Sequence, residues 1–104
     1  MTDCLFCKIV SQEIPSPLIY EDEKCVAFAD IHPKDKTHLL IVPKKHIATV
    51  AEVTEENEHL LGHLVVTAKR LAAEKKLEGY KLQFNVGKSA GQEIFHIHLH
   101  LIGH

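Results

Sequence analysis

Apolar and polar residues alternate along several short stretches of the chain, and this period-two pattern predicts β-strands. In one such stretch, residues 96–102, three histidines alternate with Ile97, Leu99 and Leu101. In a strand, the three imidazoles share one face and the three aliphatic side chains share the other. Shorter apolar or alternating runs predict four further strands, at residues 18–21, 25–29, 38–42 and 80–86.

Apolar residues three and four positions apart predict one long amphipathic helix. Its apolar stripe consists of Leu60, Leu61, Leu64, Val65, Ala68, Leu71 and Ala72. Thr54 is the predicted N-cap, two glutamates follow it in the first turn, and Gly79 is predicted to stop the helix just after Leu77. Residues 4–10 predict one or two further helical turns. This order of elements predicts an α+β fold, with a five-stranded, mostly antiparallel sheet and its helices on one side.

Composition limits the classes of function. A length of 104 residues suits a single domain, residues 1–104. The formal net charge is −2, which disfavours a nucleic-acid partner. No apolar run approaches the roughly 20 residues needed to span a bilayer, and the N-terminal residues lack the pattern of a signal peptide. We therefore expect a soluble, cytoplasmic protein with no membrane partner. Nine histidines are many for this length and point to imidazole chemistry.

The three cysteines are an odd number, which argues against a disulfide framework in a reducing compartment. Cys4 and Cys7 have C-x-x-C spacing, which fits half of a zinc site, a redox pair, or two reduced thiols packed as small apolar groups. A thioredoxin-like redox role needs a βαβ context that the predicted elements lack. Cys25 lies within a predicted strand and is expected in the core.

The three histidines of residues 96–102 would bind one metal ion together only with severe strain, although two adjacent members, about 6.6 Å apart, could share one. A strand rises about 3.3 Å per residue, so His96 and His100 start about 13 Å apart, whereas zinc–nitrogen bonds are only about 2.1 Å long. We therefore expect the histidines to have different roles. The middle one, His98, suits nucleophilic attack on phosphorus, because a neutral imidazole is a good nucleophile at pH 7. The glycine-bearing loop at residues 87–92 either presents N–H groups to a phosphate or simply connects two strands.

The sequence HIHLHLI at residues 96–102 resembles the His-φ-His-φ-His-φ-φ motif of the histidine-triad (HIT) family of nucleotide hydrolases and transferases. Other segments, spread over almost the whole chain, resemble the same family and more narrowly its nucleotide-binding phosphoramidase branch. They are IPS (14–16), YED (20–22), AF (27–28), DI (30–31), TH (37–38), IVPKKHI (41–47) and GQEIF (91–95).

The resemblance implies a nucleotide hydrolase in which His98 attacks the α-phosphate. A nucleotidyl-histidine forms, and water then releases the nucleoside monophosphate. The other ring nitrogen of His98 would donate to a main-chain carbonyl of its own strand, and His100 and His38 would complete the catalytic set. The expected substrates are purine nucleoside 5′-phosphoramidates, cleaved at the phosphorus–nitrogen bond, and related acyl-nucleotides. A dinucleoside polyphosphate hydrolase and a non-catalytic nucleotide-binding adaptor module are the alternatives.

The resemblance also implies a set of substrate-binding residues. These are Asp30 for the ribose hydroxyls, Asn85, Gly91, Gln92 and Glu93 for the phosphate and leaving group, and Phe6, Ile9, Phe28, Ile31 and Leu40 for the base. For the apolar members of this set, an ordinary place in the core is the alternative. Glu93 stands where many animal relatives have serine, so a serine-mediated contribution to leaving-group departure is not expected.

A structural zinc ion and a homodimer are further implications of the resemblance. In the subset of the family with this cysteine pair, the other ligands are the histidine after Pro-Lys-Lys, here His46, and the first triad histidine, here His96. Together with Cys4 and Cys7 they would close a tetrahedral structural site, and no catalytic metal is expected. Members of this branch pair through the long helix and a strand, so the sheet would continue across a dimer.

Overall fold

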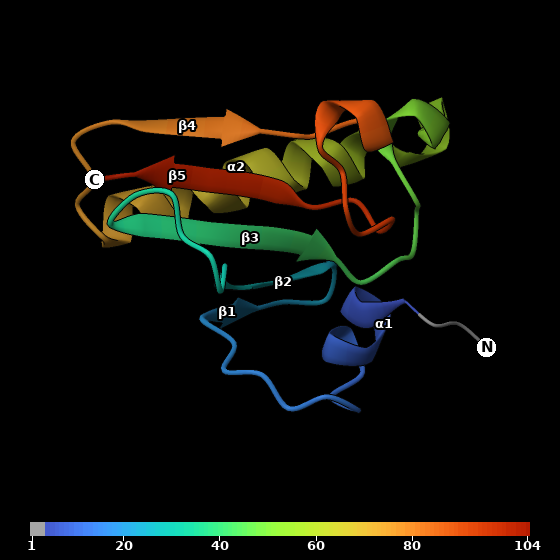
Figure 1. The fold of residues 1–104 in the computed structure, drawn as a ribbon, viewed down its shortest axis with the longest axis horizontal. Coiled ribbons are helices and arrows are strands. Elements are labelled where there is room, and N and C mark those ends of the chain that lie inside the picture. Colours follow the sequence, from blue (N-terminus) through green and yellow to red (C-terminus); the bar gives the residue numbers. More distant parts are fainter. Residues whose placement is uncertain (1–3) are drawn as a thin grey trace.

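The computed structural model describes residues 4–104 (Figure 1). It has a five-stranded sheet in the order β1-β2-β3-β5-β4, and every neighbouring pair of strands is antiparallel. The strands are β1 (Tyr20–Glu21), β2 (Cys25–Ala29), β3 (Thr37–Pro43), β4 (Tyr80–Gln83) and β5 (Leu99–Gly103), and the α-helices are α1 (Leu5–Val10) and α2 (Glu58–Glu74). Single 3₁₀ turns lie at Val50–Glu52, Glu55–Asn57 and Lys88–Ala90. The α+β class, the antiparallel sheet and the pair of one long and one short helix are confirmed. Within the described residues, no helix is both long and apolar enough to cross a membrane.

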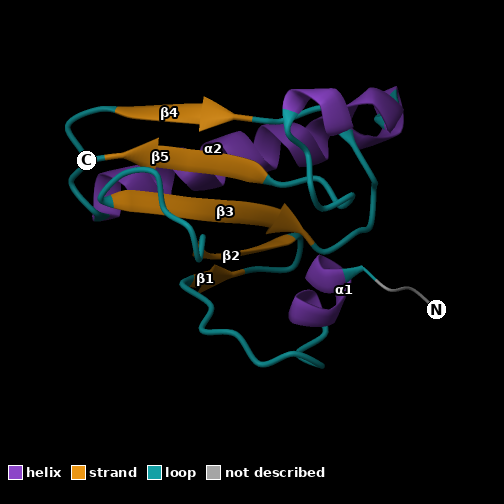
Figure 2. Ribbon diagram, in the orientation of Figure 1, coloured by secondary structure: helices purple, strands orange, loops and turns teal. Residues whose placement is uncertain are grey.

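The two helices cover opposite faces of the sheet. On one face, Leu64, Ala68 and Leu71 of α2 pack against alternate residues of β2, β3 and β5, and Figure 2 shows α2 running behind these strands. On the other face, Phe6 and Ile9 of α1 pack against the intervening residues of β2 and β3. The prediction that the helices lie on one side is therefore wrong. Because both faces are covered, β2 and β3 have near-continuous apolar sequences rather than a strict alternation.

The long helix is shorter than predicted at both ends. The α-helix begins only at Glu58, after a 3₁₀ turn, and the Thr54 side chain makes no capping hydrogen bond. At the other end, Lys76 adopts a left-handed conformation with φ of 57°. The N–H groups of Lys76 and Leu77 then donate to the carbonyls of Ala73 and Ala72. This pattern closes the helix before Gly79 is reached, so the predicted glycine stop is wrong.

The two strands around the histidine motif are also shorter than predicted. β4 ends at Gln83, and β5 begins at Leu99 rather than His96. The main chain just before β5 has other partners, because the Ile97 N–H donates to the Ile47 carbonyl (2.8 Å) and the His96 carbonyl accepts from the His98 imidazole (2.8 Å). The predicted shared face of the three aliphatic side chains is confirmed, because Ile97, Leu99 and Leu101 all belong to the core cluster under α2.

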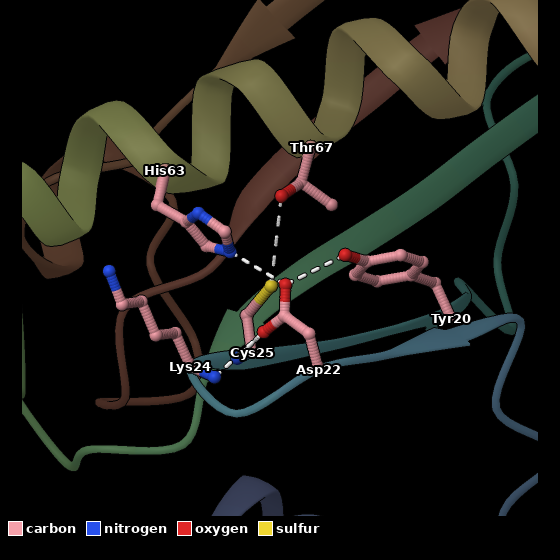
Figure 3. A network of polar contacts seen from close by, with 6 residues as sticks. All are labelled: Tyr20, Asp22, Lys24, Cys25, His63 and Thr67. Carbon is pink, nitrogen blue, oxygen red and sulfur yellow. Dashed lines mark hydrogen bonds and ion pairs between the residues drawn. The ribbon is translucent and has the colours of Figure 1, made fainter.

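A polar network joins the β1–β2 turn to α2 (Figure 3). The Asp22 carboxylate accepts hydrogen bonds from the Tyr20 hydroxyl (2.7 Å), His63 Nε2 (2.7 Å) and the N–H groups of Lys24 (2.7 Å) and Cys25 (2.8 Å). Burial alone raises the pKa of Asp22, but these donors outweigh it and hold the pKa well below the ordinary range. The Cys25 side chain is fully buried beside Thr67, in the core position predicted for it.

Candidate functional site

A cavity of about 460 Å³ lies on the α1 face of the sheet. The three residues predicted as catalytic, His38, His98 and His100, all line it. So do all but one of the predicted binding residues: Phe6, Ile9, Phe28, Asp30, Ile31, Leu40, Asn85, Gly91 and Glu93. The fold thus brings residues from α1, β2, β3, β5 and the loop before β5 to one hollow. Such a volume falls within the range of small-molecule sites.

Gln92 is the predicted binding residue that the structure places elsewhere. Its side chain is buried, its Oε1 accepts from the Gly87 N–H (3.0 Å), and its Nε2 donates to the carbonyls of Ala48 (2.8 Å) and Ile94 (3.1 Å). With both ends of the amide engaged by main chain, Gln92 braces the loop before β5. The contact of Gln92 with a phosphate stays a prediction, since its side chain lies outside this cavity.

The cavity also contains residues that the sequence analysis did not select, namely Leu5, Ser16, Ala29, His32, Lys34 and Ile94. Two of these residues, His32 and Lys34, have titratable side chains. Both lie in the β2–β3 connection, between Asp30 and His38. A signal for them was present in the sequence, because a short connection between two neighbouring strands must lie at the same end of the sheet as the residues that flank it.

The ring of His98 is held in one orientation. Its Nδ1–H donates to the His96 carbonyl (2.8 Å), so the neutral imidazole has its free lone pair on Nε2. The Phe6 ring packs edge-on against it, with the ring centroids 5.0 Å apart and the planes at 87°. Burial lowers the pKa of His98, which favours the neutral ring. A neutral, oriented imidazole with an available lone pair is the state that a nucleophile requires.

A chain of hydrogen bonds fixes the protons of His38 and His100. The Lys34 N–H donates to His38 Nδ1 (3.1 Å), so neutral His38 has its own proton on Nε2. His38 Nε2–H then donates to His100 Nδ1 (2.9 Å between the two nitrogen atoms), which leaves the proton of neutral His100 on Nε2. Among residues 4–104 no group accepts from this buried Nε2. A buried donor without a partner costs about 1–3 kcal/mol, so this atom is prepared to bind an acceptor on a ligand.

Both of these rings stay neutral at physiological pH. Burial lowers the pKa of His38, and the Asp30 carboxylate, 3.4 Å from His38 Nε2, only partly opposes that effect. Burial, together with the neighbouring His98 and His38 rings, lowers the pKa of His100 to about 4. The hydrogen-bond directions given above require neutral rings, and the electrostatics of the cavity favour them.

Beside the cavity, the predicted metal ligands Cys4, Cys7, His46 and His96 form one cluster, in which the four potential ligand atoms lie within 4.8 Å of one another. His96 Nδ1 lies 3.3 Å from Cys4 Sγ and 3.1 Å from His46 Nδ1, and Cys7 Sγ lies 3.3 Å from His46 Nδ1. A tetrahedral zinc site has ligand–ligand separations of about 3.3–3.8 Å, given its bond lengths of about 2.1 Å to nitrogen and 2.3 Å to sulfur. These three separations are within a few tenths of an ångström of that spacing.

The tautomer of His96 also suits a metal ligand. Its Nε2–H donates to the Pro43 carbonyl (2.8 Å), which leaves an unprotonated Nδ1 facing the two sulfur atoms. A main-chain acceptor on the second ring nitrogen is the usual way in which a ligating histidine is oriented. The four residues therefore fit a metal ion that prefers sulfur and imidazole ligands.

The chain is similar in sequence and fold to several known proteins. Residues 3–104 match the family model described as "Scavenger mRNA decapping enzyme C-term binding". A purine nucleoside phosphoramidase of Escherichia coli K12 is 41% identical over 103 residues, which are 97% of this chain and 87% of the relative. The crystal structure of a HIT family hydrolase from Legionella pneumophila is 50% identical with a TM-score of 0.94, and the match covers 97% of this chain and 92% of that one. A zinc-bound histidine-triad protein from Mycobacterium smegmatis is 34% identical with a TM-score of 0.86, with coverage of 97% and 74%.

Proposed function

The chain belongs to the histidine-triad (HIT) family, and from this premise we propose that it hydrolyses purine nucleoside 5′-phosphoramidates and related acyl-nucleotides. The observation that carries the proposal is the oriented, neutral His98 on the wall of a cavity that also contains an unpaired imidazole donor on His100. The phosphoramidase named among the relatives supports the choice of the phosphorus–nitrogen bond.

In the proposed reaction, the lone pair of His98 Nε2 attacks the α-phosphorus and forms a phosphorus–nitrogen bond. The bond to the leaving amine breaks, its electron pair stays on the amine nitrogen, and that nitrogen takes up a proton from solvent, to which the attacking water of the second step returns one. The Nε2–H of His100 donates to a phosphoryl oxygen and stabilises the charge that develops there. Water then attacks the nucleotidyl-His98, which releases the nucleoside monophosphate and restores the imidazole lone pair.

The walls of the cavity suggest how the nucleotide lies. Asp30 would accept hydrogen bonds from the ribose hydroxyls, since a carboxylate is an acceptor for both. Phe6 and Phe28, whose centroids are 5.5 Å apart, form an apolar wall for the base. Ile31 lines the cavity and is 85% exposed at its rim, where it could contact the base. Asn85, Gly91 and Glu93, from the segment between β4 and β5, would hold the phosphate and the leaving group.

We further propose that the Cys4–Cys7–His46–His96 cluster binds structural zinc. Four protein ligands leave no open position on the ion, so its contribution would be a tetrahedral cross-link between α1 and the segments that contain His46 and His96. The tautomer of His96 and the spacing of the ligand atoms support this assignment.

Homodimer formation is proposed as well. Val65 and Val66 on α2 and Tyr80 and Leu82 on β4 are between 38% and 44% exposed. β4 is an edge strand, and an exposed apolar edge is a natural place for a second sheet to pair. These features support a dimer in which the sheet continues from β4 to its counterpart. A cytoplasmic location stays a prediction.

The test is turnover of adenosine 5′-phosphoramidate by the wild-type protein and by His98→Ala and His98→Asn. Loss of the nucleophile should reduce kcat by at least about a thousandfold. Full hydrolysis by either variant would refute the proposal. A diadenosine polyphosphate measured in parallel separates the second family activity. Tight binding of nucleoside monophosphate without any His98-dependent turnover would instead favour the adaptor function.

A further inference from the structure

His96 belongs to two sites at once. Its Nδ1 lies 3.3 Å from Cys4 Sγ and 3.5 Å from Cys7 Sγ, inside the metal-ligand cluster. Its main-chain carbonyl accepts the hydrogen bond that orients His98 (2.8 Å). The side chain is completely buried, so it has no room for a different rotamer without displacing its neighbours. Any shift of His96 in the cluster is therefore passed to the carbonyl that holds the nucleophile.

A second connection runs through α1. Cys4 is the N-cap of this helix, with its Sγ accepting from the Cys7 N–H (3.2 Å), and Phe6 lies between the two cysteines. The Phe6 ring contacts His98 edge-on at 5.0 Å and lines the cavity. A six-residue helix is far too short to be stable by itself. It is held on the sheet by Phe6, Ile9 and the cluster.

The rest of the fold does not depend on these contacts. The core cluster under α2 contains residues of β2, β3, β5 and α2, together with Ile47 and Ile97, and their main-chain hydrogen bond (2.8 Å) does not involve the metal ligands. None of the four proposed metal ligands belongs to this core. The sheet and α2 should therefore stay folded when the metal-ligand cluster is disrupted. The consequences of disruption should be confined to α1, His96 and His98.

We propose that the Cys4–Cys7–His46–His96 cluster is a positioning element for the nucleophile. With its metal bound, it fixes His98 through the His96 carbonyl and fixes one wall of the nucleotide cavity through Phe6. Without the metal, nucleotide affinity falls and the His98 ring loses its fixed orientation, while the sheet stays folded. The inference rests on the proposed role of His98, but it is tested by binding and spectroscopy, which need no turnover.

The experiment compares the zinc-loaded wild-type protein, the same protein after chelation, and Cys4→Ser. Serine keeps an N-cap acceptor at position 4 but is a poor zinc ligand, so this change separates the metal from the cap. Cys25→Ala is the matched control, because it removes a thiol that is buried on the other face of the sheet. Each protein is assayed for zinc content, for affinity for adenosine 5′-monophosphate, and for the His98 Nδ1–H resonance in imidazole-selective NMR.

The expected result is stoichiometric zinc in the wild-type protein. After chelation, the affinity for adenosine 5′-monophosphate should be roughly 10- to 100-fold weaker, which is the size of effect seen when groups that orient a site are removed. The His98 Nδ1–H resonance should vanish with the metal. Zn²⁺ should restore both properties to the chelated wild-type protein but not to Cys4→Ser, and Cys25→Ala should match the wild type. Because chelation alone supplies the comparison, a poorly folding Cys4→Ser does not prevent the test.

Two outcomes would overturn the inference: wild-type protein without stoichiometric metal, or chelated protein with unchanged affinity and an unchanged His98 resonance. Failure of the proposed function looks different. In that case the zinc-loaded protein binds the nucleotide and keeps the resonance, yet adenosine 5′-phosphoramidate is not hydrolysed.

Discussion

The hydrogen-bond chain from Lys34 to His100 makes a sharp prediction about His38. This side chain is buried and its ring lies between the Lys34 N–H and His100 Nδ1. Replacing it with alanine should leave His100 neutral but free to move its proton from Nε2 to Nδ1. In that tautomer Nε2 presents a lone pair instead of a donor to the phosphoryl oxygen. His38→Ala should therefore act by removing the donor that belongs to His100.

The size of the effect follows from the bond that is lost. A hydrogen bond to a charged group contributes about 1.5–3 kcal/mol. At about 1.4 kcal/mol per tenfold change in rate, kcat/KM should fall by about 10- to 150-fold. His100→Ala removes the same donor outright, so its loss should be similar or somewhat larger. The double variant should be little worse than His100→Ala alone, because both changes abolish one interaction.

The assay is a double-mutant cycle in kcat/KM for adenosine 5′-phosphoramidate, with thermal unfolding measured on each variant. His59→Ala, on the exposed side of α2 and far along the chain from the cavity residues, serves as the histidine control. Additive losses would show that the two imidazoles act separately. A loss smaller than about threefold in His38→Ala, in protein that is still folded, would remove the tautomer chain from the mechanism.

Three further predictions concern stability and can be checked by urea unfolding. Asp22→Ala should lower the free energy of unfolding by roughly 2–4 kcal/mol, because four hydrogen bonds to a carboxylate are lost. A decrease under about 0.5 kcal/mol would show that the network in Figure 3 contributes little to stability. Gly103→Ala should lower the free energy of unfolding by about 1–3 kcal/mol, since a Cβ there would lie 2.6 Å from that of Tyr80. Gly62→Ala, where a Cβ on α2 would meet open space, should raise it by about 0.5–1 kcal/mol. Equal effects of the two substitutions would contradict the packing. The third follows from burial, which with the nearby imidazoles lowers the pKa of His100 to about 4. The unfolded chain takes up a proton on this residue below about pH 6.5 and the folded protein only below about pH 4, so the free energy of unfolding should fall by up to about 3 kcal/mol as pH drops through this window. His100→Gln should lose less stability over the same window, and an unchanged slope would refute the assignment.

Much of the fold and site could be predicted from the sequence because the signals are local and repeated. Burial of alternate residues imposes the apolar pattern that predicted β2 and β3. The histidine spacing forces a shared face and excludes one ion for all three rings. The resemblance then predicted His38, Asp30 and Asn85 as members of one cavity, which the structure places together.

Several features that the sequence did not predict depend on main-chain hydrogen bonds and backbone conformation, which the residue types alone do not reveal. The side chain of Gln92 makes hydrogen bonds to three main-chain groups, which its residue type alone does not predict. Lys34 was missed, although its N–H sets the tautomer of His38. The helix stop at Lys76 needs a left-handed conformation that propensity assigns to glycine. The side of the sheet that α1 covers depends on the path of the chain through residues 11–19, which have no periodic pattern.

Whether His98 forms a covalent intermediate is the most direct question for the proposed chemistry. Wild-type protein mixed with adenosine 5′-phosphoramidate, quenched at alkaline pH within the first turnovers and digested, should yield one adenylylated peptide with the modification on His98. His98→Asn should yield none. Continued turnover with no adduct, or with the adduct on another residue, would contradict the mechanism.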